Sequence, residues 1–255
     1  MFKSLIMAKK VIPVSKLPVI SKSQSFPEDP ETFSSGAIIL MDKPQGWSSF
    51  DLVKYVRNRI PPKKVGHAGT LDPMATGLLI LCSGKATKSI SQIQLMEKRY
   101  VTTIRFGAST PSYDAATEID ETANWNHINA SMIEEMVHSE FTGVVSQVPP
   151  IYSAIQIKGE RLYKIARRGG SVEIEPREIV IHEIKVLDVS MPNVTLEILC
   201  GKGTYIRSLA HDLGIALGSR AHMIELRRSE TGGFSVTDSL TPEQFDEEMK
   251  SLKHV

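Results

Sequence analysis

The stretch that most constrains this chain runs from Gly66 to Cys82, where a glycine-rich loop leads directly into an apolar run. Three glycines within twelve residues allow the loop backbone to adopt positive φ angles. Leu78 to Cys82 is a short apolar segment that predicts a buried strand. One acid, Asp72, lies between them, and the proline that follows it favours an extended backbone. The pattern predicts a single carboxylate on a tight loop beside the core.

Asp72 has two interpretations at this stage. Asp-Pro is a common turn pair, because an Asp side chain can hydrogen-bond to its own backbone, and this makes a structural role the ordinary expectation. Alternatively, a carboxylate on a loop beside a rigid strand is well placed for covalent or acid–base chemistry. His67 is open to the same two interpretations. The residues alone do not choose between them.

Hydrophobic spacing predicts both strands and helices along the rest of the chain. Capping boxes are expected at Ser48 with Asp51 and at Ser131 with Glu134, and Pro242 suits the first position of a helix capped by Thr241. The expected strands are residues 37–41, 78–82, 100–106, 180–189 and 194–200, the last two joined by a turn at 191–193. Four helices are expected. The first runs from Ser48 up to Pro61 and the second spans 131–141. The third carries Leu209, Leu213 and Leu217 on one face, and the fourth follows Thr241.

Gly66 to Thr87 resembles the catalytic motif of the TruB-type pseudouridine synthases, whose core reads GH-x-G-x-LDP-x-ATG-L. The resemblance covers roughly residues 36–235. It implies an α+β pseudouridine synthase fold with a bent, mainly antiparallel sheet, flanking helices, a central catalytic cleft and an inserted RNA-gripping segment. The other matching motifs are Asp42 to Ser49, Lys98 to Tyr100, the loop with Thr110 and Asp114, Gln147 to Ala154, Gly201 to Ser208 and Met223 to Arg228.

The resemblance implies a role for individual residues. Asp72 is implied as the nucleophile, Tyr100 as an aromatic that stacks on the target base, and Arg207 as the guanidinium that keeps the carboxylate ionised and oriented. His67 is expected to enter the space that the base vacates. Further residues expected to contact the substrate are Lys43, Asp114, Tyr205 and Leu226. The loop that contains Thr110 and Asp114 differs from that of many relatives at two positions: Pro111, where they carry Asp, and Thr117, where they carry Gly.

Charge supports RNA binding only locally, because the net charge is +1. One basic cluster belongs to the helix after Ser48 and its end, and its last members, Lys63 and Lys64, are expected to contact substrate phosphates. A second runs from Lys158 to Arg168 and is interleaved with tyrosines, as in surfaces that bind both backbone and bases. Either cluster is alternatively a solvated face. The first cluster consists of Lys54, Arg57, Arg59, Lys63 and Lys64.

The function that the resemblance implies is isomerisation of a uridine in the T-loop of tRNA, at position 55, to pseudouridine by base flipping. The expected partner is the T-arm stem-loop of tRNA, and a monomer is expected. No cofactor and no metal is expected, and Gly84 to Lys88 lacks the spacing of a phosphate-binding loop. Two alternatives stay open: a synthase for another RNA, and an RNA-binding chaperone that opens and refolds the tRNA elbow.

The expected domain organisation has three parts. Residues 1–35 are expected to form a flexible basic extension, 36–235 the catalytic domain, and 236–255 a short helical tail without the PUA domain of many bacterial relatives. No apolar run is long enough to span a membrane, and both cysteines lie in apolar runs that suit buried thiols. A cytoplasmic location is therefore expected, with organellar targeting through the first part as the alternative.

Overall fold

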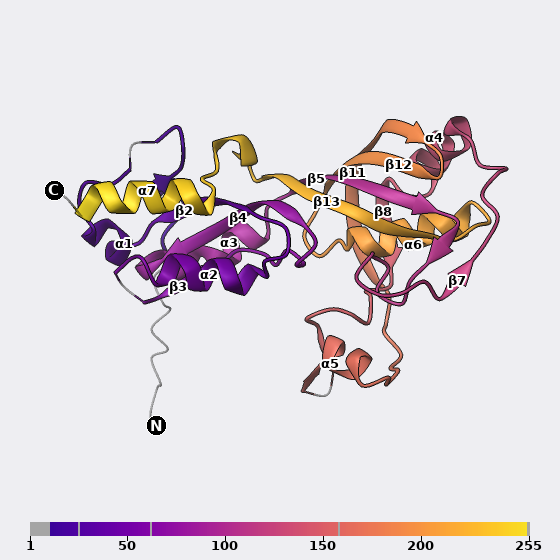
Figure 1. The fold of residues 1–255 in the computed structure, drawn as a ribbon, viewed down its shortest axis with the longest axis horizontal. Coiled ribbons are helices and arrows are strands. Elements are labelled where there is room, and N and C mark those ends of the chain that lie inside the picture. Colours follow the sequence, from indigo (N-terminus) through magenta and orange to yellow (C-terminus); the bar gives the residue numbers. More distant parts are fainter. Residues whose placement is uncertain (1–10, 25, 62, 158, 254–255) are drawn as a thin grey trace, which may run out of the picture. The chain divides into compact units, whose positions relative to one another are not determined.

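The structure is a computed structural model that describes residues 11–24, 26–61, 63–157 and 159–253. The chain divides into two units: unit 1 comprises residues 1–96 and 229–255, and unit 2 comprises residues 97–228. Figure 1 labels many of the elements of the two units, each of which contains helices and strands. This mixture agrees with the expected α+β class.

Unit 1 contains the whole first third of the chain and its C-terminal part. Its strands are β1 (Val19–Ile20), β2 (Ile38–Lys43), β3 (Val65–His67), β4 (Thr76–Ser83) and β14 (Phe234–Ser235). Its helices are η1 (Val14–Lys16), α1 (Glu31–Ser35), α2 (Ser49–Arg57), η2 (Gly84–Ser89), α3 (Ile90–Gln94), η3 (Val236–Asp238) and α7 (Pro242–Lys253).

Unit 2 contains the longest strands of the chain. Its strands are β5 (Lys98–Phe106), β6 (Ala108–Ser109), β7 (Glu121–Thr122), β8 (Gly143–Gln147), β9 (Gln156–Ile157), β10 (Glu160–Arg161), β11 (Arg177–Ser190) and β12 (Asn193–Cys200). Its helices are α4 (Ala130–Ser139), α5 (Leu162–Arg167) and α6 (Ile206–Ala216). Strand β13 (Ala221–Thr231) begins in unit 2 and ends in unit 1.

The sheet of unit 1 is built on β2 and β4, which pair antiparallel with Ile39 opposite Leu81. Strand β1 runs parallel to β2, and β3 pairs antiparallel with β4. Both central strands are buried along nearly their whole length, as is typical of strands covered on both faces. The strands predicted at 37–41 and 78–82 are confirmed. The first starts one residue later and ends two residues later than predicted, and the second is three residues longer.

Helix α2 begins as its sequence predicts. The Ser48 side chain accepts a hydrogen bond from the Asp51 N–H, and the Asp51 carboxylate accepts one from the Ser48 N–H, so the capping box is confirmed. The helix ends at Arg57, earlier than the expected end before Pro61. Ile60 is buried even so. Its place in the apolar pattern therefore reflects burial after the helix end rather than another helical turn.

The N-terminal part corrects an expectation. Residues 11–24 and 26–35 are not a flexible extension, because Val19 and Ile20 pair with β2 and the side chain of Phe33 is fully buried. Helix α1 also approaches the turn after β4 so closely that a Cβ on Gly84 would lie 2.2 Å from the Ser34 carbonyl oxygen. This part of the chain belongs to the core of unit 1. Residues 1–10, which hold three of the lysines in the expected basic tail, lie outside the described residues.

The C-terminal helix is also part of unit 1. Thr241 caps α7 by accepting from the Gln244 N–H, and the Gln244 side chain accepts from the Thr241 N–H in return, so the cap predicted at Thr241 is confirmed. Phe245 is fully buried. The helix is therefore an integral element rather than a loose tail.

The sheet of unit 2 has the order β5-β12-β11-β8, with antiparallel pairs throughout this series. The hairpin predicted from residues 180–200 is confirmed, with Met191 and Pro192 at the turn and Asn193 already in β12. Together with unit 1, the strand pairs are mainly antiparallel, as expected. The bend of the sheet and a central cleft stay predictions.

Helix α4 corrects the capping box expected at Ser131. The helix begins at Ala130, and its cap is Asn129, whose side chain accepts from the Met132 N–H. Asn is as good an N-cap as Ser, and the earlier start leaves Ser131 inside the first turn. Ile133 and Val137 form the buried face, as their spacing predicts.

Candidate functional site

The loop that carries Asp72 connects two paired strands. Gly66 lies opposite Cys82 and His67 opposite Leu81, so both belong to β3, whereas the sequence pattern places them in the loop. The loop itself spans residues 68–75. Asp72 lies in it, half-buried, and its carbonyl accepts a hydrogen bond of 3.1 Å from the Ala75 N–H. The sequence argument therefore located the acid correctly, on a short turn beside a buried strand.

The residue before Asp72 is fixed by the first turn of α2. The Ser49 hydroxyl accepts from the Leu71 N–H at 2.8 Å and donates to the Leu71 carbonyl at 2.9 Å. Both side chains are buried. The sequence places Ser49 at a helix start and in the motif from Asp42 to Ser49, but it did not predict the contact with Leu71.

The residue after Asp72 is held by the Gly46 N–H, which donates to the Pro73 carbonyl at 2.8 Å, and by a buried lysine. The Lys43 ammonium donates to the carbonyls of Pro44, Trp47 and Pro73 at 2.9, 2.7 and 3.4 Å. Its side chain is fully buried. The ammonium thus holds the loops around Asp72 together, and its expected contact with the substrate stays a prediction.

The basic cluster of unit 1 is smaller than the sequence suggests. Lys63 and Lys64 are exposed. Arg59, by contrast, forms an ion pair with Asp246 of α7, and its guanidinium lies 3.4 Å from the centre of the Tyr55 ring. Arg59 therefore ties α2 to α7 and does not extend the exposed basic surface.

Arg207, the cation of the implied catalytic set, is buried in unit 2. It lies in the first turn of α6 and is 5% exposed. Its two terminal nitrogens donate to the carbonyls of Ser112 and Tyr152 at 3.2 and 3.0 Å, and its Nε lies 3.6 Å from Oδ2 of Asp114. The guanidinium is thus oriented by groups from two separate segments of unit 2.

Asp114 belongs to a loop that is organised from within. Its Oδ1 accepts from the Ser112 hydroxyl at 2.6 Å and from the Ala116 N–H at 3.0 Å. The preceding residue, Tyr113, has a φ of +62° and stacks on His211 at 3.9 Å. The structure therefore brings Asp114 together with Arg207, a partner that the sequence argument did not assign to it. Its expected contact with the substrate stays a prediction.

Tyr205 immediately precedes α6 and is half-buried. The Gln147 side chain accepts from its N–H at 2.8 Å and donates to its carbonyl at 3.0 Å. The Arg177 guanidinium lies 5.0 Å from the centre of the Tyr205 ring and donates to the Gly203 carbonyl. Both sides of the tyrosine are thus restrained by residues of the unit 2 sheet.

Tyr100 and Leu226 are both buried in unit 2, on β5 and β13. Lys98 lies on the same face of β5 as Tyr100 and is also buried. Burial and the nearby Arg228 lower the pKa of Lys98 to about 8. Asp72 belongs to unit 1, whereas Tyr100 and Arg207 belong to unit 2, and their convergence stays a prediction.

The second basic cluster lies on and around α5, which Figure 1 shows on loops that stand apart from the sheet of unit 2. Arg161, Lys164 and Arg167 are exposed. Arg168 forms an ion pair of 2.6 Å with Glu160. Lys158, the first member of the cluster, lies outside the described residues. The exposed members keep this surface a candidate for RNA contact.

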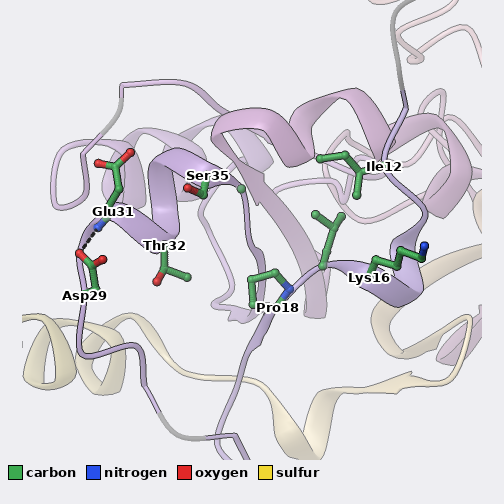
Figure 2. Close-up of a pocket in the computed structure, with 9 residues that line it drawn as sticks. Ile12, Lys16, Pro18, Asp29, Glu31, Thr32 and Ser35 are labelled. Atoms are coloured by element: carbon green, nitrogen blue, oxygen red, sulfur yellow. Dashed lines mark hydrogen bonds between the residues drawn. The ribbon is translucent and has the colours of Figure 1, made fainter.

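Unit 1 and unit 2 each contain a cavity. Figure 2 shows the first, of about 320 Å³, between η1 and α1, with Asp29 accepting from the Glu31 N–H at 2.8 Å. It contains none of the predicted site residues. The second, of about 280 Å³, lies in unit 2 and includes Gln147 and Asp212 in its lining. Burial raises the pKa of Asp212 to about 6.

Three further findings concern metal ligands, membrane spans and the two cysteines. Within the described ranges, no group of three or more His, Cys, Asp or Glu side chains is placed to hold a metal ion. In the same part of the chain, no helix combines the length and apolar character of a membrane span. Both cysteines are free and buried, and burial raises the pKa of Cys82 to about 12 and of Cys200 to about 11.

Comparison with known families matches most of the chain. The sequence model described as "TruB family pseudouridylate synthase (N terminal domain)" matches residues 57–206, and the one described as "tRNA pseudouridylate synthase B C-terminal domain" matches residues 207–254. A protein of Flavobacterium johnsoniae named "tRNA pseudouridine synthase B" is 46% identical over 228 residues, which cover 87% of this chain and 99% of that protein. A protein of the same name from Bacteroides thetaiotaomicron is 47% identical over 225 residues, covering 84% and 93%.

Solved structures agree. A chain in the crystal structure of a Cbf5-Nop10-Gar1 complex has a TM-score of 0.63 and 29% identity, covering 87% of this chain and 58% of that one. A chain in the archaeal box H/ACA sRNP Nop10-Cbf5 complex has a TM-score of 0.65 and 25% identity, covering 93% and 62%. The chain thus spans less than two thirds of these two solved chains. Fold and sequence together define a pseudouridine synthase, an isomerase that acts on RNA. The chain belongs to the TruB family of pseudouridylate synthases, as its motifs predict.

Proposed function

We propose that this pseudouridine synthase acts on tRNA and isomerises the uridine at position 55 of the T-loop. The support comes from relatives that are named for tRNA and are matched over nearly their whole length. We further propose that the enzyme works as a monomer in the cytoplasm. The exposed cations Lys63 and Lys64 of unit 1, and those around α5 in unit 2, supply positive surface for the phosphates of the T-arm.

In this proposal the target uridine leaves its stack and enters a protein pocket. Asp72 acts as the nucleophile while the bond between the ribose and N1 of uracil breaks. The uracil turns and its C5 bonds to the same ribose carbon. The proton on C5 is lost to solvent and N1 takes up a proton, so the product is an isomer of the substrate. Tyr100 stacks on the base, Tyr205 and Leu226 pack around it, and His67 fills the space that it vacates.

The observation that carries the proposal is the anchoring of the Asp72 loop on both sides. Ser49 holds the residue before the acid and Lys43 holds the residue after it. Such anchoring restricts the carboxylate to a narrow range of positions, which nucleophilic catalysis requires and a turn residue does not. Arg207 is oriented by three groups and is proposed to keep this carboxylate ionised.

The test uses the full chain and an RNA stem-loop with the T-arm sequence. Purified protein should convert the uridine at the position equivalent to 55 to pseudouridine without added cofactor, as read by carbodiimide labelling and reverse transcription. A stem-loop with cytidine at that position should give no product. Absence of pseudouridine in both this RNA and whole tRNA would overturn the assignment. Product formed only in another cellular RNA would favour a synthase with a different substrate.

A further inference from the structure

We propose that Gln147 is a positioning residue for the reaction: its buried amide fixes the start of α6 and thereby the residues Tyr205 and Arg207. The inference rests on the proposed function, in which Tyr205 contacts the base and Arg207 orients the nucleophile. Gln147 itself is not proposed to touch the substrate. Its action is through the backbone of its neighbour.

Helix α6 has no cap of its own. Its N-cap residue is Tyr205, whose side chain makes no capping hydrogen bond. The first N–H groups of a helix have no partner within the helix and need one from outside. Tyrosine is also not among the residues that usually supply this cap. The start of α6 therefore depends on a group from another part of the chain.

Gln147 supplies that group from the end of β8. Its Oε1 accepts from the Tyr205 N–H at 2.8 Å, and its Nε2 donates to the Tyr205 carbonyl at 3.0 Å. The side chain is 3% exposed. The same carbonyl accepts the first helical hydrogen bond, from Leu209 at 3.2 Å. The amide thus fixes both polar groups of the residue at which the helix begins.

The segment that follows Gln147 also contacts the first turn of α6. The Ser208 hydroxyl donates to the Val148 carbonyl at 2.8 Å, and Arg207 donates to the Tyr152 carbonyl at 3.0 Å. Residues 147–152 and the first turn of α6 are therefore joined at successive points. The Gln147 amide is the point nearest the helix start, and it is the one that determines where α6 begins.

An amide fits these two contacts at any pH. The site requires an acceptor and a donor in one planar group, which glutamine provides and an ionised glutamate does not. Leucine has a similar shape but would leave two backbone groups of Tyr205 without their side-chain partner. Because a displacement of about 1 Å in a positioning group can reduce turnover about 100-fold, a loose helix start should be felt in catalysis.

The first test is Gln147→Leu in the full-length protein. Turnover of the T-arm RNA should fall about 10-fold to 100-fold, whereas the KM should change by less than about 3-fold, because the exposed cations that bind phosphate are untouched. Hydrogen exchange of the amides of residues 206–209 should accelerate selectively. The control is Ser146→Ala, an exposed neighbour on β8, which should leave both measurements unchanged.

The second test is Gln147→Glu and uses pH as the rescue. A protonated carboxyl can donate to the Tyr205 carbonyl, but a carboxylate cannot, and burial raises the pKa of a carboxyl. The turnover of this variant relative to wild type should therefore rise as pH falls from about 8.5 to about 6. The charged or titratable groups nearest the position are Arg177, opposite it on β11, Tyr205, and Glu140 and Asp212 in the shared cavity lining. Since wild type carries the same groups, the ratio isolates the new carboxyl.

The outcomes separate the two proposals. If wild type forms no pseudouridine, the proposed function fails. If wild type is active and both variants keep its turnover at every pH, or if Gln147→Glu shows a loss that pH does not alter, the positioning role of Gln147 is overturned. An equal loss of turnover with uniformly faster hydrogen exchange across the chain would also overturn it, because that result reports general destabilisation.

Discussion

The Ser49 hydroxyl and the backbone of Leu71 form a two-way hydrogen bond, with the hydroxyl accepting from the N–H at 2.8 Å and donating to the carbonyl at 2.9 Å. The two residues are far apart in sequence, and the contact joins the start of α2 to the residue before Asp72. A hydroxyl is the smallest side chain that can satisfy both groups at once.

Ser49→Ala should lower both stability and turnover. The change leaves two buried backbone groups of Leu71 without their partner, which should cost about 1–3 kcal/mol in the free energy of unfolding. Turnover should fall more than substrate affinity, since the Asp72 loop loses one of its two anchors. Urea unfolding and steady-state kinetics measure the two effects. Ser91→Ala, at an exposed position on α3, serves as the control, and an equal effect there would remove the anchor interpretation.

Asp72→Asn should abolish pseudouridine formation and leave tRNA affinity within a few-fold. The amide keeps the shape of the side chain but is a far weaker nucleophile than a carboxylate. Filter binding and pseudouridine mapping on the same protein measure the two quantities. Asp188→Asn, an exposed carboxylate on β11, should change neither. Full activity of the Asp72 variant would exclude the nucleophile assignment, and full tRNA refolding by it would favour the chaperone alternative.

Lys63→Gln together with Lys64→Gln should weaken tRNA binding and reduce its dependence on salt. Each phosphate contact contributes about 0.7–0.9 to the slope of log K against log salt, so the slope should fall by about 1.5. The control pair is Lys185→Gln with Lys250→Gln, because both lysines are exposed and already face carboxylates. A slope that does not move in the first variant would show that this surface lies outside the interface.

Phe33→Ala should destabilise the protein by about 3–5 kcal/mol, as expected for a large aromatic side chain removed from a core. Phe33 is fully buried and packs against Phe26. Phe50→Ala is the matched control, since Phe50 is 60% exposed and its loss should change stability by no more than about 0.5 kcal/mol. Similar effects of the two changes would mean that residues 26–35 do not contribute to the core.

Asp212→Asn should stabilise the protein above pH 6. Burial raises the pKa of the Asp212 carboxyl from 3.8 to about 6, so the folded state retains a proton that the unfolded state has lost. The stability of the wild type therefore falls as pH rises through this range, and the variant lacks that loss. The gain should be about 1–2 kcal/mol after allowance for solvent screening. The gain should disappear below about pH 4, and urea unfolding at several pH values measures it. A gain that does not change with pH would contradict the raised pKa of Asp212 as its cause.

The elements that were predicted correctly are those with a local signal. The apolar run before Asp42 and the run from Leu78 to Cys82 are long enough to specify buried strands. Ser48 and Asp51 carry a complete capping box. Strands β1 and β3 have two and three residues, and their existence depends on partners elsewhere in the chain rather than on periodicity. For this reason the sequence did not predict that residues 19–20 form a strand or that His67 lies in a strand.

The candidate site divides in the same way. The sequence motifs predict Asp72, Tyr100 and Arg207 as site residues, but they do not predict the groups that hold Arg207 and the Asp72 loop. Contacts such as that of Gln147 with Tyr205 join distant positions and leave no periodic pattern. The burial of Lys43 was not predicted either, because a lysine is seldom fully buried and its ordinary place is at the surface.

The enclosure of Lys43 has a practical consequence for mapping where RNA binds. Its ammonium is fully buried and donates to three carbonyls, so an acylating reagent that labels solvent-accessible amines should pass it by with or without RNA. Lys63 and Lys64 should react readily in the free protein. Protection in a lysine footprint will therefore report on the phosphate-facing surface alone, and any labelling at Lys43 will serve as an internal signal that the chain has opened.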